Sequence, residues 1–359
     1  MRRPERRGRT APRATAVRVA GVLAGVRVVA VLVAAAVLGG CAGTGGGPSR
    51  AATDGAGGHG DGAPFWNNPE GPAERQAAAY RAAGRHRDAE LIERIADRPV
   101  AEWLGAERAE AEEQARTYTV AAGAAGRRAV LVLYNIPHRD CGQYSRGGAR
   151  DAAAYREWLA GVVRGIGGRP ATVIVEPDAL PHLLQEGCTP HRFHDERYRL
   201  LHEAVTSLAA LADTDVYLDA GNAGWVREPG ALVEPLRKAG VGAADGFALN
   251  VANFRTTAAS VAYGRELSRK LGGAHFVVDT SRNGNGPADG TGEAAWCNPP
   301  GRALGTPPTT RTGHERVDAY LWIKRPGESD GSCGGAPEAG EWFPRYALAL
   351  ARRARADRP

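Results

Sequence analysis

The chain has 359 residues and a formal net charge of +6, but the positive charge is concentrated at its start. Residues 1–27 hold eight arginines against one acid, and without residues 1–40 the chain has 38 basic and 39 acidic residues, a net charge of −1. The charge therefore gives no support for a protein that binds nucleic acid.

A leader sequence is predicted at the start of the chain. The arginine-rich stretch is followed at 28–38 by an uncharged apolar run, the pattern of a secretory signal, and this run is shorter than the roughly 20 residues of a membrane-spanning helix. The two glycines before Cys41 are typical of a bacterial lipoprotein signal, in which the cysteine becomes lipidated. We therefore expect a lipoprotein-type signal peptide at 1–40, export of the protein, and membrane contact only through a lipid on Cys41. An ordinary signal peptide before an unmodified cysteine is the alternative.

One folded domain is expected after the leader. Residues 41–63 consist mostly of small and polar residues, with too few large apolar side chains to fold, which predicts a flexible Gly/Ala-rich tether. Residues 64–359 are numerous enough for one large α/β domain, and they contain no second linker and no internal repeat.

Short apolar, β-branched runs alternate with helical patterns through this domain. Nearly continuous apolar runs indicate parallel strands that are buried on both faces, and the alternation indicates crossover helices between them. Strands are predicted at 98–104, 128–136, 171–177, 214–220, 245–251, 274–280 and 317–324. Helices are predicted at 107–122, 149–165, 195–212, 229–239 and 256–271. This order predicts an α/β fold, a distorted parallel (β/α) barrel of about seven strands, with the active-site cleft at the carboxyl ends of the strands.

Acidic residues lie at or soon after the ends of most of these strands. They are Asp140, Asp178, Asp219, Asp279, Glu328 and Asp330. For a single acid, a helix N-cap or a turn explains the position equally well, but the repetition at successive strand ends predicts one cleft where the carboxylates converge. Such a cleft suits glycoside hydrolysis, in which one carboxyl group donates a proton and another helps to activate water.

Six short motifs occur in order along the domain. They lie at 134–141 (YNIPHRDC), 175–180 (VEPDAL), 217–225, 250–254 (NVANF), 279–284 (DTSRNG) and 324–331. In sequence, order and spacing they resemble signatures of glycoside hydrolase family 6, the cellulase family B, and the resemblance covers essentially residues 64–359. It implies an inverting β-1,4-glucan hydrolase that uses no metal and no cofactor.

The resemblance also implies roles for individual residues. Asp178 corresponds to the general acid, Asp140 to the residue that keeps this acid protonated, and Asp330 to the candidate base. Tyr134 corresponds to the tyrosine that distorts the sugar beside the scissile bond, and Ser145 to a serine that holds the nucleophilic water. Because the family inverts the anomeric centre, the acid and base carboxyl groups are expected to be roughly 6.5–9.5 Å apart.

Other residues are implied to bind the sugar. Lys324 and Glu328 correspond to sugar-binding residues, and Asp219 to a supporting acid. Asn222 stands where the family often has His, and since Asn can still form hydrogen bonds with a hydroxyl group, the difference concerns subsite preference. The tryptophans expected to stack on sugar rings are Trp225, Trp296 and, at a strand end, Trp103, whereas Trp158 and Trp322 are expected in the core.

Four cysteines remain when Cys41 is set aside, and four cysteines allow three disulfide connectivities. The pairs nearest in sequence are favoured, and the resemblance implies the same pairs, Cys141–Cys188 and Cys297–Cys333. No CxxC motif occurs, so no metal site is predicted. The histidines expected to face solvent rather than to bind a metal are His182, His191, His194 and His202.

The resulting hypothesis is an exported, monomeric endo-β-1,4-glucanase with an open cleft and a β-1,4-glucan substrate. The chain is too short for the long tunnel-forming loops of the family's cellobiohydrolases, and its YNIP and CGQYSRGG segments resemble those of the endoglucanases. Two alternatives stay open. One is a hydrolase of another β-glycan, such as a mixed-linkage or cell-wall glycan, and the other is a non-catalytic surface lipoprotein that binds glycan.

Overall fold

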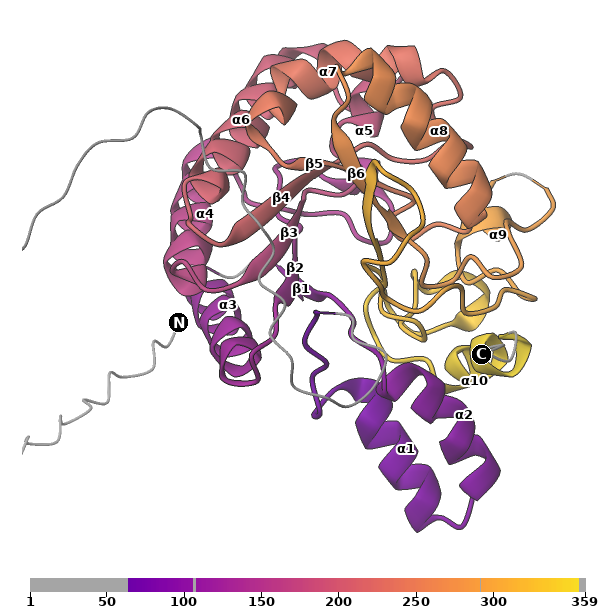
Figure 1. Cartoon of the computed structure of the whole chain (residues 1–359). Helices are drawn as coiled ribbons and strands as arrows, with labels where there is room; N and C mark the ends of the chain where they lie inside the picture. The colour runs from indigo at the N-terminus through magenta and orange to yellow at the C-terminus, as the bar shows by residue number, and fades with distance from the viewer. Residues whose placement is uncertain (1–63, 106–107, 291, 355–359) are drawn as a thin grey trace, which may run out of the picture. The chain divides into compact units, whose positions relative to one another are not determined.

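The computed structural model describes residues 64–354, except 106–107 and 291 (Figure 1). The predicted signal peptide, Cys41 and the tether lie outside the described residues. Within the described part, no helix combines the length and the apolar character needed to cross a membrane.

Seven parallel strands form one curled sheet, and each strand pairs with its neighbours in chain order (Figure 1). The strands are β1 (Glu102–Leu104), β2 (Ala129–Leu133), β3 (Ala171–Val175), β4 (Thr214–Asp219), β5 (Gly246–Leu249), β6 (His275–Asp279) and β7 (Val317–Leu321). The two edges approach each other where the Ala101 N–H donates to the Trp322 carbonyl at 3.0 Å, but no ladder joins β1 to β7 in the described residues. The predicted distorted barrel of about seven strands is confirmed.

The strands are buried on both faces, which explains their continuous apolar runs. In β2, Leu131 and Leu133 belong to the core between the sheet and its helices, which includes Trp158 of α4 (Ala152–Ile166). The alternate residues Val130 and Val132 belong to a separate cluster that fills the interior of the curled sheet. Because side chains in a strand alternate between faces, both faces must be apolar when both are covered.

The five predicted helices are present within a few residues of their expected bounds. Besides α4 they are α3 (Arg108–Ala124), α6 (His194–Ala209), α7 (Val233–Lys238, after a 3₁₀ turn at Pro229–Leu232) and α8 (Thr257–Lys270). Local sequence sets the ends of α4, because the Asp151 side chain accepts the Ala154 N–H at 2.8 Å at its start. Gly167 ends the helix with a left-handed backbone at φ 56°.

Three further helices lie outside the predicted set and form a second core. They are α1 (Pro72–Ala82), α2 (His86–Ala96) and α10 (Pro344–Arg353), and they lie together in Figure 1. Their buried faces pack with Trp322, which follows β7, so the predicted core position of this tryptophan is confirmed, as is that of Trp158. Two short helices, α5 (Pro181–Leu184) and α9 (Glu293–Trp296), lie in the segments after β3 and β6.

Candidate active site

A cleft of about 1050 Å³ opens at the carboxyl ends of the strands. It is lined by β1 and by the segments after the following strands, because all the strands are parallel and end on the same side. Of the twelve residues predicted for catalysis or sugar binding, Asp219 alone lies beneath the cleft, at 1% exposure. The eleven that line it are Trp103, Tyr134, Asp140, Ser145, Asp178, Asn222, Trp225, Trp296, Lys324, Glu328 and Asp330.

Asp178 follows β3 and forms a carboxyl pair with Asp219 at the end of β4. The Asp178 backbone is left-handed, with φ 70°, and its N–H donates to Asp219 Oδ2 at 2.9 Å. The same Asp219 oxygen accepts the Gly221 N–H at 3.1 Å. Burial, followed by the negative charges of Asp219 and Asp140, raises the pKa of Asp178 well above its usual range.

The proton of this pair belongs on Asp178. Burial raises the pKa of Asp219 as well, but the two N–H groups that Asp219 accepts stabilise its ionised form and oppose the rise. No described residue donates a hydrogen bond to the carboxyl oxygens of Asp178, so its charged form has no comparable support. The arrangement therefore favours the proton on Asp178, at the cleft wall, over Asp219 beneath it.

Asp140 lies in a tightly folded loop after β2. Its backbone is left-handed, with φ 61°, and its Oδ2 accepts the Ser145 N–H at 2.6 Å. Arg139 Nε donates to the Ser145 carbonyl at 2.8 Å, which closes the loop from the other side. Burial raises the pKa of Asp140, although the Ser145 N–H opposes the rise. These contacts fix a second carboxyl group and the Ser145 side chain on the cleft wall.

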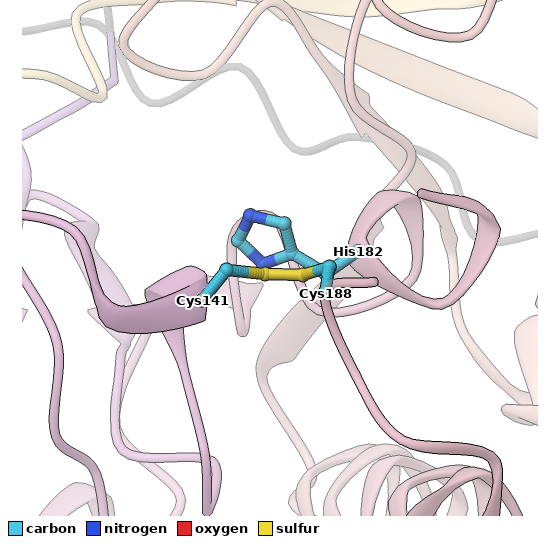
Figure 2. A group of neighbouring side chains, drawn as sticks. All are labelled: Cys141, His182 and Cys188. Carbon is cyan, nitrogen blue, oxygen red and sulfur yellow. A yellow bond between two sulfur atoms is a disulfide. The ribbon is translucent and has the colours of Figure 1, made fainter. Parts of the chain in front are cut away.

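His182 lies beside the Cys141–Cys188 disulfide, which is one of the predicted pairs (Figure 2). The prediction that this histidine faces solvent is wrong, because the imidazole is 4% exposed and packs edge-on against Trp225 at 4.9 Å between ring centroids. Burial lowers its pKa to about 4, so it is neutral at pH 7. The two sulfurs and the imidazole lie close enough to hold a metal ion, but sulfurs bonded to each other are not thiolate ligands.

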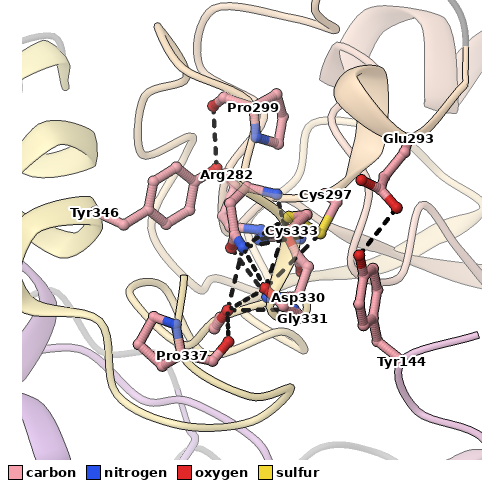
Figure 3. Close-up of a disulfide and its surroundings, with 12 residues drawn as sticks. Tyr144, Arg282, Glu293, Cys297, Pro299, Asp330, Gly331, Cys333, Pro337 and Tyr346 are labelled. Carbon is pink, nitrogen blue, oxygen red and sulfur yellow. Dashed lines mark hydrogen bonds and ion pairs between the residues drawn. A yellow bond between two sulfur atoms is a disulfide. The ribbon is translucent and has the colours of Figure 1, made fainter. Parts of the chain in front are cut away.

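Asp330 follows β7 and is held by Asn298 and by the buried Arg282, which lies beside it in Figure 3. Arg282 Nη1 donates to Asp330 Oδ2 at 2.8 Å, and the arginine side chain is fully buried. The Asn298 N–H donates to the same oxygen at 3.0 Å, and Asn298 Oδ1 accepts the Asp330 N–H at 2.9 Å. Lys324 Nζ lies 3.8 Å from the other carboxylate oxygen. Two cations therefore compensate the charge of Asp330.

The Cys297–Cys333 disulfide, the other predicted pair, joins the segment after β6 to the segment after β7, which carries Asp330 (Figure 3). Asn298 follows Cys297 directly, and its Nδ2 donates to the Gly331 carbonyl at 3.0 Å. The segment after β6 and the segment after β7 are thus held together as one unit, and this unit carries Asp330.

Aromatic side chains line the cleft in three places. Trp103 and Tyr134 meet edge to face, with 5.2 Å between ring centroids. Trp296 of α9 lies 6.1 Å from the Tyr144 ring, and Trp225 lies after β4. All three tryptophans are half-buried, so part of each ring is free to stack on the apolar face of a sugar.

Lys324 and Glu328 provide polar groups on the wall after β7. Lys324 Nζ donates to the Ser329 carbonyl at 3.1 Å, and burial lowers the pKa of this lysine. Glu328 forms an ion pair with Arg325 at 2.8 Å, and burial raises the pKa of Glu328 while Arg325 opposes the rise. Asn222 Oδ1 accepts a backbone N–H at 3.0 Å, which orients its amide.

Asp279 does not reach the cleft, contrary to the prediction that all the strand-end acids converge there. It is fully buried at the end of β6, where its Oδ2 accepts the N–H groups of Ala252 and Lys324, each at 2.9 Å. Glu176 is also buried, and its Oε2 accepts two N–H groups from the segment after β2, each at 2.9 Å. Strand ends leave N–H groups without partners, and these carboxylates satisfy them and connect neighbouring segments.

Three residues with clear positions in this site were not predicted to act in it. Arg282 and Glu176 stand inside the quoted motifs, so their place in the motifs was the available signal. Asn298 carried a weaker signal, its position next to Cys297. Nothing in the local sequence indicated that Arg282 is buried or that it reaches a carboxylate 48 positions later.

A comparison with protein families identifies the group to which this site belongs. The model described as glycosyl hydrolases family 6 matches residues 61–354. The chain belongs to this family. The predicted family is therefore confirmed, and the match extends over the whole domain.

Curated relatives of this family 6 chain include two bacterial proteins. Endoglucanase A of Cellulomonas fimi is 46% identical over 280 residues, which cover 77% of this chain and 59% of that protein. Endoglucanase 1 of Streptomyces halstedii is 41% identical over 295 residues, which cover 80% of this chain and 88% of that protein. The chain thus spans about three fifths of the length of the first relative and most of the second.

Solved structures of family 6 proteins share the fold. The endoglucanase Cel6 of Mycobacterium tuberculosis, in complex with methyl-cellobiosyl-4-deoxy-4-thio-β-D-cellobioside, has a TM-score of 0.76 and 44% identity, and the match covers 82% of this chain and 98% of that one. The GH6 enzyme of Orpinomyces sp. Y102 has a TM-score of 0.69 and 30% identity, over 81% of this chain and 96% of that one.

Proposed function

We propose that this chain is an exported, inverting endo-β-1,4-glucanase in which Asp178 is the general acid and Asp330 the candidate base. The observation that carries the proposal is the buried pair of Asp178 and Asp219, because burial and the neighbouring negative charge raise the pKa of Asp178 and favour its protonated form at the cleft wall. The endoglucanase activity agrees with the names of the relatives that are 41–46% identical. Export rests on the leader sequence alone.

The remaining roles follow from the same geometry. Asp140 lies near enough to raise the pKa of Asp178, and with Ser145 it can orient the attacking water. Asp330 forms an ion pair with Arg282 and can accept a proton from that water. Tyr134 lines the same wall and can press on the sugar beside the scissile bond. The distance of roughly 6.5–9.5 Å between acid and base carboxyl groups that inversion requires stays a prediction.

The proposed substrate is a β-1,4-glucan chain. The three tryptophans that line the cleft are spaced over segments from β1 to α9, as a chain of several sugar rings requires. Lys324, Glu328 and Asn222 supply the hydrogen-bonding groups for hydroxyls. The cellooligosaccharide analogue in the solved Mycobacterium tuberculosis complex is a ligand of that protein and supports the same class of substrate here.

The test measures release of reducing sugar from carboxymethylcellulose and barley β-glucan. The oxidised protein from residue 64 onward is compared with its Asp178→Ala variant and with Asp195→Ala, a control on the exposed face of α6. We expect the parent and the control to hydrolyse both polymers, and Asp178→Ala to lose at least about 100-fold in kcat, the usual contribution of a general acid. Proton NMR of the first products should show the α-anomer.

Two results contradict the proposal. A folded parent protein that releases no sugar from either polymer contradicts the glucanase function. An Asp178→Ala variant with parental activity leaves that function intact and removes Asp178 as the acid.

A further inference from the structure

The cleft wall carries more positive than negative charge. Among the described residues that line it, the acidic ones are Asp140, Asp178, Glu328 and Asp330. The basic ones are Arg139, Arg146, Arg227, Arg255, Lys324 and Arg325. Lys324 is paired with Asp330, and Arg325 with Glu328. The excess positive charge therefore lies on the other four arginines. An unsubstituted glucan is neutral and offers no charge that requires them.

Arg255 reaches the cleft from the segment after β5. Its backbone is fixed on both sides, because its N–H donates to Asn250 Oδ1 at 3.0 Å and its carbonyl accepts Asn283 Nδ2 at 3.0 Å. Its guanidinium packs directly on Gly224, where a Cβ would come within 2.2 Å of Arg255 Cζ, so a larger residue at 224 would displace the arginine side chain. Gly224 directly precedes Trp225, so the guanidinium lies next to this aromatic platform.

The guanidinium of Arg255 has no protein acceptor. No described residue accepts a hydrogen bond from it or forms an ion pair with it, and its Nε is buried without a partner. A buried donor without an acceptor is unfavourable, and such a group in a folded protein calls for a physical explanation. An anionic group of a ligand in the cleft would supply the missing negative charge.

Arg227 provides a second cation beside the same platform. It lies two residues after Trp225, it is exposed, and it has no carboxylate partner in the described part of the chain. The backbone just before it is held in place, because the Tyr263 hydroxyl donates to the carbonyl of Val226 at 2.7 Å. The two arginines therefore reach the cleft from separate segments, after β4 and after β5.

We infer that the part of the cleft next to Trp225 binds β-glucans that carry carboxylate groups, with Arg227 and Arg255 as the residues that recognise the charge. The sugar ring stacks on Trp225, and a carboxylate on that sugar or on its neighbour pairs with a guanidinium, which is a geometry that arginine favours. This inference rests on the proposed glucanase function and assigns it a preference for anionic chains over neutral ones.

The test compares kcat/KM on an anionic polymer, carboxymethylcellulose, with kcat/KM on a neutral one, hydroxyethylcellulose. The parent protein is measured beside Arg227→Gln, Arg255→Gln, the double variant, and Arg265→Gln, an exposed arginine of α8 as control. We expect the anionic-to-neutral ratio to fall about five-fold for each arginine removed, as expected for loss of a charge pair in an aqueous cleft, and to stay parental in the control.

Salt provides a second readout. Raising sodium chloride from about 0.01 M to about 1 M shortens the Debye length from roughly 30 Å to roughly 3 Å. The ratio should fall with salt for the parent protein and change little for the double variant. An anionic-to-neutral ratio that is the same in the parent, Arg227→Gln and the double variant overturns the inference. Because Arg227 is exposed, its replacement should leave the fold intact, so this single variant remains interpretable even if Arg255→Gln disturbs the structure.

A binding measurement separates this inference from the proposed function. Affinity electrophoresis through gels that contain either polymer, with the Arg255→Gln change placed in the Asp178→Ala background, reports binding without hydrolysis. Selective retardation by carboxymethylcellulose that disappears with Arg255→Gln supports the inference even where hydrolysis fails. Equal retardation by both polymers overturns it and leaves the glucanase function standing.

Discussion

Asn298 is expected to set the position of Asp330, and this can be tested by removing its side chain. In the Asn298→Gly variant the Asp330 N–H loses the acceptor at 2.9 Å, and the donor to the Gly331 carbonyl at 3.0 Å is also lost. The first change leaves a half-buried N–H group without a partner, which costs about 1–3 kcal/mol, and the second removes a hydrogen bond that contributes about 1 kcal/mol. We therefore expect a loss of about 2–4 kcal/mol in the free energy of unfolding.

The choice of glycine avoids a separate backbone effect. Asn298 is left-handed, with φ 45°, a conformation that asparagine and glycine adopt more easily than alanine. Asn298→Ala should therefore be less stable than Asn298→Gly by about 1 kcal/mol. The difference between the two variants reports the backbone, and the loss that they share reports the side chain.

The assays are thermal unfolding and steady-state kinetics on barley β-glucan. For a domain of this size the loss of stability should lower Tm by about 5–10 °C. If Asp330 is the base, its displacement should lower kcat on the order of 10- to 100-fold with a smaller change in KM. Asn285→Gly is the matched control, because Asn285 is exposed and donates one bond, to the Gly301 carbonyl at 2.9 Å.

One result would refute this reasoning. If Asn298→Gly is destabilised as expected but keeps the parental kcat, then Arg282 and the Cys297–Cys333 disulfide are sufficient to position Asp330. Asn298 would then contribute to the stability of the fold but not to catalysis.

Two further predictions concern the acid and the leader. Asp219→Asn removes the negative charge that helps to keep the pKa of Asp178 high, so the protonated fraction of Asp178 should fall at alkaline pH. The alkaline limb of the kcat/KM profile on barley β-glucan should move to lower pH, whereas an Asp195→Asn control should keep it in place. If Cys41 carries a lipid, the full-length chain expressed in a bacterium that processes lipoproteins should fractionate with membranes, and Cys41→Ala should release it. An unmodified Cys41 by mass spectrometry would contradict the lipid anchor.

Local sequence patterns were sufficient to predict the strands of the sheet and most of the long helices that cover it. The apolar runs of β2 to β7 reflect burial on both faces, and that burial leaves a signal in each strand by itself. The helices α1 and α2 were not predicted. They share one hydrophobic cluster with α10 from the other end of the chain, in which α2 packs on α10, and this long-range packing has no local signal.

The position of the acids was predictable, but their orientation was not. Asp178 follows a buried strand and Asp279 ends one, and the sequence pattern does not distinguish their directions. In the structure Asp178 lines the cleft, whereas Asp279 accepts N–H groups from two neighbouring segments inside the protein. The direction of each side chain depends on which N–H groups the adjacent strands leave free.

The sequence by itself determined the family, the order of the strands and the set of acids at the strand ends, because each of these depends on short motifs or local burial. For the disulfides it left three connectivities open, and the family resemblance implied the pairs that the structure contains. The tertiary structure alone decided which acids form ion pairs, which accept backbone N–H groups and which share a buried site. Arg282 and Asn298 meet Asp330 across 48 and 32 positions of chain, and Asp219 meets Asp178 across 41. The electrostatic state of a carboxyl group depends on neighbours within a few ångströms, and in this fold those neighbours come from other strands.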